Sequence, residues 1–150
     1  MKRLSIAVAA LAAIIASGSA ISSSDVDILV KGQHSNIKYY TAKDFHNQAD
    51  LDAFMATAFD KGQAPSLPAV DWNKNMVLAV FIGYQKSSGY NIRFTKVDDS
   101  GDSIQVSVRV VVPCEERARP DASQPFQIVT FPASAKPVNF NAPEQDNQKC

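Results

Sequence analysis

The stretch that decides the fold is Met76-Val-Leu-Ala-Val-Phe-Ile-Gly83, which opens a strand-rich segment extending to Val112. Every residue before the glycine is apolar, a pattern typical either of a strand covered on both faces or of a buried helix. The β-branched residues Val77, Val80 and Ile82 favour the strand, as do the turn residues that flank the run. We therefore expect a strand here that is buried on both faces.

Three later segments predict further strands. Tyr90, Ile92 and Phe94 alternate with polar residues, as in a half-buried antiparallel strand. The segment 104–112 alternates most regularly and follows a turn-forming stretch at 98–102. The segment 126–131 predicts a last strand. Residues 132–150 show no such pattern and are expected to form an irregular polar tail, with Phe140 as an anchor.

The N-terminal part of the chain predicts a short strand at 26–30 and a β-prone segment at 37–41 that could pair with it. Helical spacing follows, and it predicts one helix from about 48 to 60, with Asn47 as its N-cap. Its apolar face consists of Leu51, Phe54, Met55, Ala58 and Phe59. The expected fold class is α+β: mainly antiparallel β-sheet, curled or sandwich-like, with one helix on the N-terminal side.

Residues 1–20 have the features of a secretory signal peptide. Lys2 and Arg3 precede an apolar run at 4–16, and small residues follow at 17–20. The apolar run is shorter than the roughly 20 residues of a membrane span, and no cysteine follows it to carry a lipid. We expect a periplasmic or secreted protein without a membrane anchor, whose residues 21–150 form a single domain.

Charge argues against a nucleic-acid partner. Without Lys2 and Arg3, 13 basic residues face 15 acidic ones, which gives a formal net charge of −2. A protein with this balance has no excess of cations with which to bind a phosphate backbone.

Cys114 and Cys150 are the two cysteines of the chain. An even number in an oxidising compartment favours a disulfide bond between them. The sequence also leaves open a reactive Cys114 and an intermolecular bond through Cys150.

No group of residues in the sequence predicts catalysis or metal binding. His34 and His46 lack the spacing of a zinc site, and the Ser35-Asn-Ile-Lys38 match to a serine acyltransferase pattern falls in a predicted strand rather than a helix. Asp98, Asp99 and Asp102 lack the rest of an EF-hand loop and are interpreted as a hydrated turn. We expect no enzymatic activity and no cofactor.

The loop between the strands at 76–83 and 90–95 is the candidate binding site. We expect Gly89 to adopt a positive φ and close a hairpin. Tyr84 and Tyr90 would flank it, and Lys86, Ser87 and Ser88 would project from its tip. Tyrosine with small polar residues suits a binding loop, because it provides contact area and hydrogen bonds at low entropic cost. An ordinary hairpin with two sheet tyrosines is the alternative.

These same segments resemble a known family. Asp71-Trp72 before the apolar strand, then Lys86-Ser-Ser-Gly-Tyr90, then Pro125-Phe-Gln-Ile-Val129, is similar to the C-terminal domain of the protease complex subunit PrcB family, over about residues 67–131. Ser88 stands where a second glycine is common, and the 113–125 loop departs from the usual Gly/Pro-rich connection.

The resemblance implies an exported, non-catalytic accessory protein. Its partner would be a protein, with a secreted protease as the candidate, contacted through 86–90 and the 113–125 loop. A purely structural envelope protein is an alternative. A protease-inhibitor-like loop binder is another, by analogy with the loops that chagasin-type inhibitors insert into protease clefts. Neither the oligomeric state nor the identity of the partner follows from the sequence.

Overall fold

The computed structural model describes residues 26–150, so the predicted signal peptide at 1–20 lies outside the described residues. The described part contains eight strands and one helix. In chain order these are β1 (Asp27–Gly32), β2 (Thr41–Phe45), α1 (Gln48–Ala58), β3 (Asn75–Phe81), β4 (Asn91–Asp98), β5 (Ile104–Val112), β6 (Phe126–Pro132), β7 (Val138–Phe140) and β8 (Glu144–Asn147).

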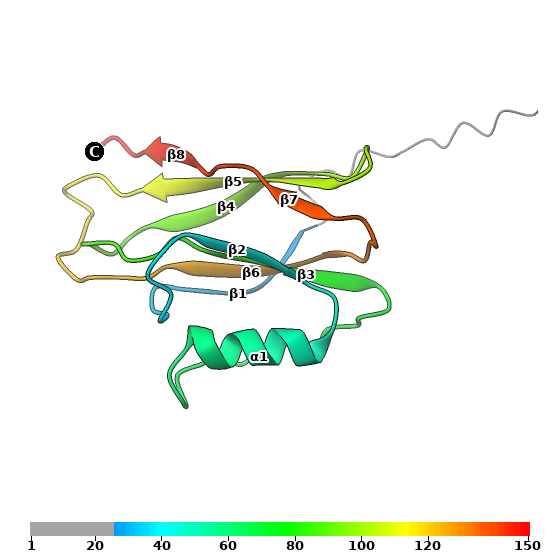
Figure 1. Cartoon of the computed structure of the whole chain (residues 1–150). Helices are drawn as coiled ribbons and strands as arrows, with labels where there is room; N and C mark the ends of the chain where they lie inside the picture. The colour runs from blue at the N-terminus through cyan, green and yellow to red at the C-terminus, as the bar shows by residue number, and fades with distance from the viewer. Residues whose placement is uncertain (1–25) are drawn as a thin grey trace, which may run out of the picture.

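The strands form two sheets stacked face to face, and α1 lies against the outer face of the first sheet (Figure 1). The first sheet has the order β1-β6-β3-β2 and is antiparallel throughout. In the second sheet β4 pairs antiparallel with β5, while β7 and β8 each pair with β5 in parallel. The predicted α+β class, with a mainly antiparallel and sandwich-like sheet, is confirmed.

Strand β3 lies at the centre of this arrangement and is buried on both faces. Met76, Leu78 and Val80 pack between the two sheets. Their neighbours Val77 and Ala79 point the other way, into the cluster beneath α1. Because successive side chains of a strand alternate between its faces, a strand with two covered faces needs apolar residues at every position. The prediction made from the unbroken apolar run is therefore confirmed.

Helix α1 begins where the sequence predicts and ends two residues earlier. Asn47 caps it, because its Oδ1 accepts a hydrogen bond from the Asp50 N–H at 2.8 Å. Leu51, Met55 and Ala58 form its buried face. Phe59 is the C-cap residue and has extended backbone angles, so the helix stops before Asp60.

The predicted strand at 37–41 is wrong. The backbone N–H of Asn36 donates to Ala58 O at 2.7 Å, and that of Ile37 donates to Ser35 Oγ at 3.3 Å, so this segment is held as a loop. The strand starts at Thr41 instead. It pairs with β3, and β1 pairs with β6 at the opposite edge of the sheet.

The tail is also more regular than its sequence predicts. Both β7 and β8 lie along β5, with Ile104 opposite Val138 and Arg109 opposite Glu144. An ion pair of 3.1 Å joins the Arg109 guanidinium to the Glu144 carboxylate. The strand β8, Glu-Gln-Asp-Asn, has no apolar residue to reveal it. It forms because β5 offers a free edge to which the backbone can hydrogen-bond.

Candidate functional site

The segment Tyr84–Tyr90 connects the two sheets and is not a hairpin turn. Its preceding strand β3 belongs to the first sheet, and its following strand β4 belongs to the second. The hairpin prediction is wrong because both edges of β3 are already occupied, one by β2 and the other by β6. The chain therefore crosses to the other sheet, where β4 pairs with β5.

The segment 84–90 pairs instead with the 113–125 loop. Gln85 and Ser123 exchange two backbone hydrogen bonds of 2.8 and 3.0 Å, and the Ser88 N–H donates to Arg119 O at 3.1 Å. The buried Ser123 hydroxyl donates to Ser87 O at 2.7 Å. The two loops that the sequence analysis proposes as a joint contact surface thus lie side by side and brace each other.

Two glycines with positive φ bound the segment. Gly83 has φ +80 and Gly89 has φ +101, as expected for Gly89. A Cβ on Gly83 would lie 2.7 Å from Lys38 O and 2.9 Å from the Tyr39 backbone. Next to it, the Tyr84 N–H donates to Lys38 O at 3.0 Å. Only glycine allows this close approach, which places the 38–40 loop directly beside the segment.

Replacing Gly83 with alanine is expected to lower the free energy of unfolding by about 2–3 kcal/mol, from the positive φ and the clash with the Lys38–Tyr39 backbone. Gly62→Ala is the matched control, because Gly62 has φ +81 and a Cβ at this position would have no atom within 4 Å. It should cost only about 1 kcal/mol. Urea denaturation of both variants measures the difference, and equal losses would show that the close approach at Gly83 contributes nothing.

The candidate residues of the segment differ in their exposure. Tyr84 is 57% exposed, and Lys86 and Gly89 are exposed as well. Ser87, Ser88 and Tyr90 are half-buried. The two serines, expected to project from a tip, contribute backbone groups to the pairing with the 113–125 loop. The groups free to contact another molecule are therefore chiefly those of Tyr84 and Lys86.

All four tyrosines of the chain gather around this segment. Tyr39, 82% exposed, lies in the loop that contacts Gly83, beside Tyr40, which is 39% exposed. Tyr40 and Tyr90 line a hollow of about 280 Å³, and partial burial raises the pKa of Tyr40. The rest of its lining is Ile82, Gln85, Val110, Val112, Pro143 and Gln145.

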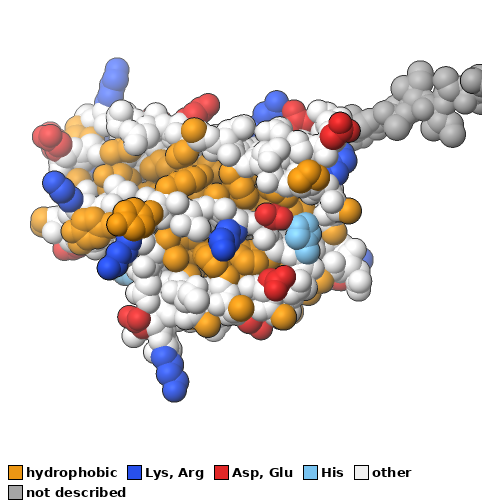
Figure 2. Space-filling view, in the orientation of Figure 1, with side chains coloured by type: hydrophobic (Ala, Val, Ile, Leu, Met, Phe, Trp, Pro, Cys, Tyr) orange, Lys and Arg blue, Asp and Glu red, His pale blue; other side chains and the backbone are white. Residues whose placement is uncertain are grey.

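We call Tyr39, Tyr40, Tyr84, Lys86 and Tyr90, with this hollow, the tyrosine face. Figure 2 shows hydrophobic side chains, the class in which tyrosine is drawn, at the left of the molecule and in a band that continues across its middle. Figure 1 places the loops before β4 and after β5 at the same end. Sequence reasoning missed Tyr39 and Tyr40 because it assigned them to a strand. Their adjacency was the available signal, since consecutive strand residues point to opposite faces and cannot both be buried in a one-sided sheet.

A disulfide bond ties the 113–125 loop, which pairs with segment 84–90, to the end of the chain. Cys114 and Cys150 are bonded to each other, with 5.5 Å between their Cα atoms. The intramolecular bond that the sequence favours over the two alternatives is therefore the one present, and neither thiol is free. The bond joins the start of the 113–125 loop to the residues after β8, which supports both segments.

The residues considered for catalysis or metal binding lie in separate parts of the described structure. His46 pairs with Asp44 at 2.8 Å, whereas His34 lies beside Ser35 in a separate hollow. The buried Ser35 hydroxyl donates to Gln124 O at 3.1 Å, so it serves the loop structure. Within residues 26–150, no three His, Cys, Asp or Glu side chains are grouped as metal ligands.

Asp98 acts as a turn cap. Hydrogen bonds from the Ser100 side chain and backbone, with a smaller effect from Lys96, lower the pKa of the Asp98 carboxyl from 3.8 to about 2. We predict that Ser100→Ala moves this pKa back towards 3.8. Because the pKa is lowered in the folded state, the contribution of this carboxylate to stability is present above pH 3.8 and is lost as the pH falls through about 2.

NMR titration of the Asp98 carboxyl carbon measures this pKa directly. An Asp98 pKa that is the same in the parent protein and in Ser100→Ala would contradict the assignment of Ser100 as its main partner.

One comparison with known proteins gives a family match over part of the chain. Residues 76–134, from β3 through β6, match the family model described as PrcB C-terminal. The matched region starts at Met76, so the upstream motif at 67–72 lies outside it.

Neither the curated proteins nor the solved structures contain a significant match to the chain. The one helix in the described part is neither long enough nor apolar enough to cross a membrane. The resemblance seen in the sequence is confirmed, and over residues 76–134 this chain matches the PrcB C-terminal family.

Proposed function

We propose that this chain is an exported, non-catalytic binding protein that contacts a protein partner through the tyrosine face. The observation that carries the proposal is the gathering of all four tyrosines at one end of the molecule. Of the four large hydrophobic side chains exposed in the described residues, three belong to this face: Tyr39, Tyr40 and Tyr84. Tyrosine suits protein interfaces because its ring provides apolar area while its hydroxyl can hydrogen-bond.

The family match supports a particular class of partner. The PrcB C-terminal match suggests association with a component of a protease complex. The Cys114–Cys150 bond supports export, since disulfide bonds persist in oxidising compartments. We propose that the partner is a secreted protease or another subunit of its complex.

The geometry favours contact by a broad face over insertion of a single loop. Segment 84–90 is hydrogen-bonded to the 113–125 loop at both Gln85 and Ser88, so it does not stand alone as a plug. The exposed tyrosines come from two separate segments, 38–40 and 84–90. A partner would therefore cover both segments at once, and substitutions in either should weaken binding.

The double variant Tyr84→Ala, Lys86→Ala tests this proposal. Both side chains are exposed and neither belongs to the core clusters, so the fold should survive. Loss of an aromatic anchor and an adjacent charge is expected to reduce binding roughly tenfold or more. Capture of a secreted protease by the tagged protein, detected by mass spectrometry and by zymography, provides the measurement.

Lys61→Ala is the matched control, because Lys61 is an exposed lysine near the end of α1, in a different loop. It should capture the protease as well as the parent protein does. Undiminished capture by the double variant would contradict the assignment of the tyrosine face. Thermal melts distinguish the purely structural alternative, which predicts that changes in this segment alter stability and no partner contact.

A further inference from the structure

A second surface lies where the two sheets end on the same side of the sandwich. β1 is the last strand of the first sheet and β4 is the last strand of the second, so each has one edge that pairs with no strand among residues 26–150. Two hollows of about 300 and 340 Å³ lie between them. The hollows share Lys31, Asn91 and Ile92 and so form one continuous feature, which we call the edge groove.

Side-chain amides occupy the hydrogen-bonding groups at the free edge of β4. Gln33 Nε2 donates to Tyr90 O at 2.9 Å, and Asn91 Oδ1 accepts from the Ile92 N–H at 2.9 Å. Tyr90 and Ile92 are two residues apart, which is the interval at which a strand presents its peptide groups to the same neighbour. The two amides therefore stand where the peptide groups of another strand would bind.

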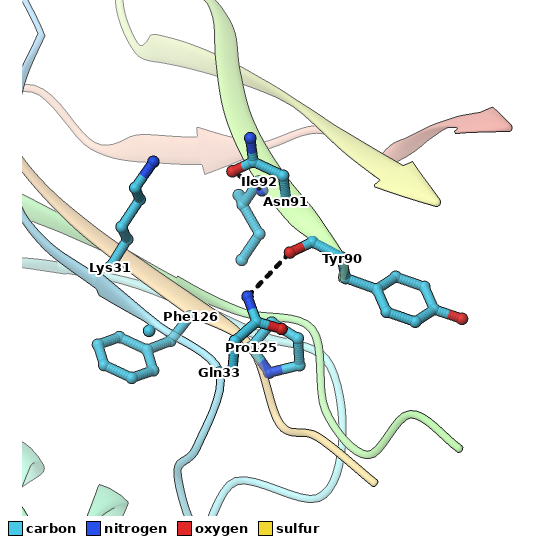
Figure 3. A pocket seen from close by; sticks show the side chains of 8 residues that line it. Lys31, Gln33, Tyr90, Asn91, Ile92, Pro125 and Phe126 are labelled. Atoms are coloured by element: carbon cyan, nitrogen blue, oxygen red, sulfur yellow. Dashed lines mark hydrogen bonds between the residues drawn. The ribbon is translucent and has the colours of Figure 1, made fainter. Parts of the chain in front are cut away.

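Gln33, which lines the groove, has one buried atom without a partner. Gln33 Oε1 is buried and accepts no hydrogen bond from the described residues. A buried acceptor without a partner is unfavourable, so an incoming strand that moves the Gln33 side chain out into solvent would relieve that cost. Figure 3 shows Gln33 directed at the Tyr90 carbonyl, while the Tyr90 ring points away from this pocket. The groove and the tyrosine face therefore use different parts of Tyr90.

The charge of the groove has one sign. Lys31 and Arg93 line it, no aspartate or glutamate does, and neither cation forms an ion pair with a described residue. The buried amide Gln127, only 4% exposed, adds a polar group on its floor. Ile28 and Phe94 supply apolar surface beside the two cations. This lining complements a strand whose side chains alternate between carboxylate and apolar groups.

We propose that the edge groove binds an extended acidic segment of another protein, which adds to the free edge of β4 as a further strand. In such β-augmentation, main-chain hydrogen bonds give affinity and alternate side chains give specificity. The added strand would displace the two side-chain amides, with a peptide N–H donating to Tyr90 O and a peptide carbonyl accepting from the Ile92 N–H, and its carboxylates would pair with Lys31 and Arg93. This site is separate from the tyrosine face and does not depend on it.

The test uses the isotope-labelled protein and the peptide acetyl-(Val-Glu)5-amide as a probe. Chemical-shift changes in NMR spectra should be concentrated at the backbone amides of Lys31, Gln33 and Asn91–Phe94, and at the side-chain amide of Gln33. The matched peptides (Val-Lys)5 and (Val-Gln)5 should bind roughly tenfold or more weakly, since the groove repels the first and offers the second no ion pair.

Charge reversal tests the two cations. Lys31→Glu with Arg93→Glu should weaken binding of the acidic probe roughly tenfold or more. Lys61→Glu, the same charge change in another loop, and Tyr84→Ala should leave it unchanged. Lys31→Gln with Arg93→Gln gives the same direction without introducing new acidic groups, in case the reversed pair fails to fold.

Three results would overturn the proposal. One is equal binding of the acidic and basic probes. Another is the absence of localised shifts with the acidic probe at millimolar concentration. The third is a shift of the same groove amides on raising the concentration of the protein alone, which would identify a second copy of this chain as the occupant.

Discussion

Replacing Phe81 with alanine is expected to lower the free energy of unfolding by about 3–5 kcal/mol, the largest single-residue effect we predict. Phe81 is fully buried at the end of β3. Its ring stacks on Phe126 with 5.4 Å between centroids, and it meets Phe54 edge-on, also at 5.4 Å. Removing the ring leaves a cavity between the first sheet and α1, which those neighbours can fill only in part. Urea denaturation followed by circular dichroism measures the loss.

Tyr39→Ala is the control for this prediction, because it removes a ring that is 82% exposed. A surface truncation of this kind usually changes stability by no more than about 0.5 kcal/mol. If Phe81→Ala cost no more than Tyr39→Ala, the cluster between α1 and the first sheet would not be a core of this fold.

Loss of the disulfide bond should produce the second large effect. The bond joins residues separated by 36 positions, and closing a loop of this length restricts the unfolded chain by roughly 3–4 kcal/mol at 25 °C. The Cys114→Ser, Cys150→Ser double variant is expected to lose about that much stability, with the same result on reducing the parent protein. Denaturation with and without reductant measures it.

The effect on structure should be local. Among the described residues β8 pairs with β5 alone, so hydrogen exchange in 144–147 should accelerate while β3 stays protected in the folded variant. A double variant as stable as the parent protein, with unchanged exchange in β8, would contradict a structural role of the bond.

The elements with strong local patterns could be predicted from the sequence. The unbroken apolar run of β3, the alternation of β5 and the helical spacing of α1 each show which faces of that element are buried. The strand pairings could not be predicted in the same way. The hairpin between β3 and β4 was a reasonable expectation, since consecutive strands usually pair. It failed because β3 finds both its neighbours, β2 and β6, elsewhere in the chain.

The tyrosine face, too, could be predicted from the sequence only in part. Segment 84–90 could be singled out from its own composition, and the structure places it beside the 113–125 loop as expected. Tyr39 and Tyr40 are distant from this segment in the sequence, and the fold brings them beside it through the close approach of Gly83 to the 38–40 loop. The edge groove had no sequence signal either, because Lys31, Gln33 and Arg93 come from segments that belong to different sheets.

The fold thus presents two separate surfaces. The tyrosine face is built on the loops at one end of the sandwich, and the edge groove runs along its open side. A partner that covers the face would not need to enter the groove, so one chain could contact a folded protein and hold an extended segment at the same time.

Photo-crosslinking at position 84 tests the central proposal most directly. The protein would be produced in the cells that normally export it, with a benzophenone amino acid in place of Tyr84. This group should crosslink to a protein partner that is part of a protease complex. The same group at Lys61, an exposed position in a different loop, should give no such product. Equal crosslinking from both positions, or none from position 84 while a protease still co-purifies, would contradict the assignment of the tyrosine face as the site of contact.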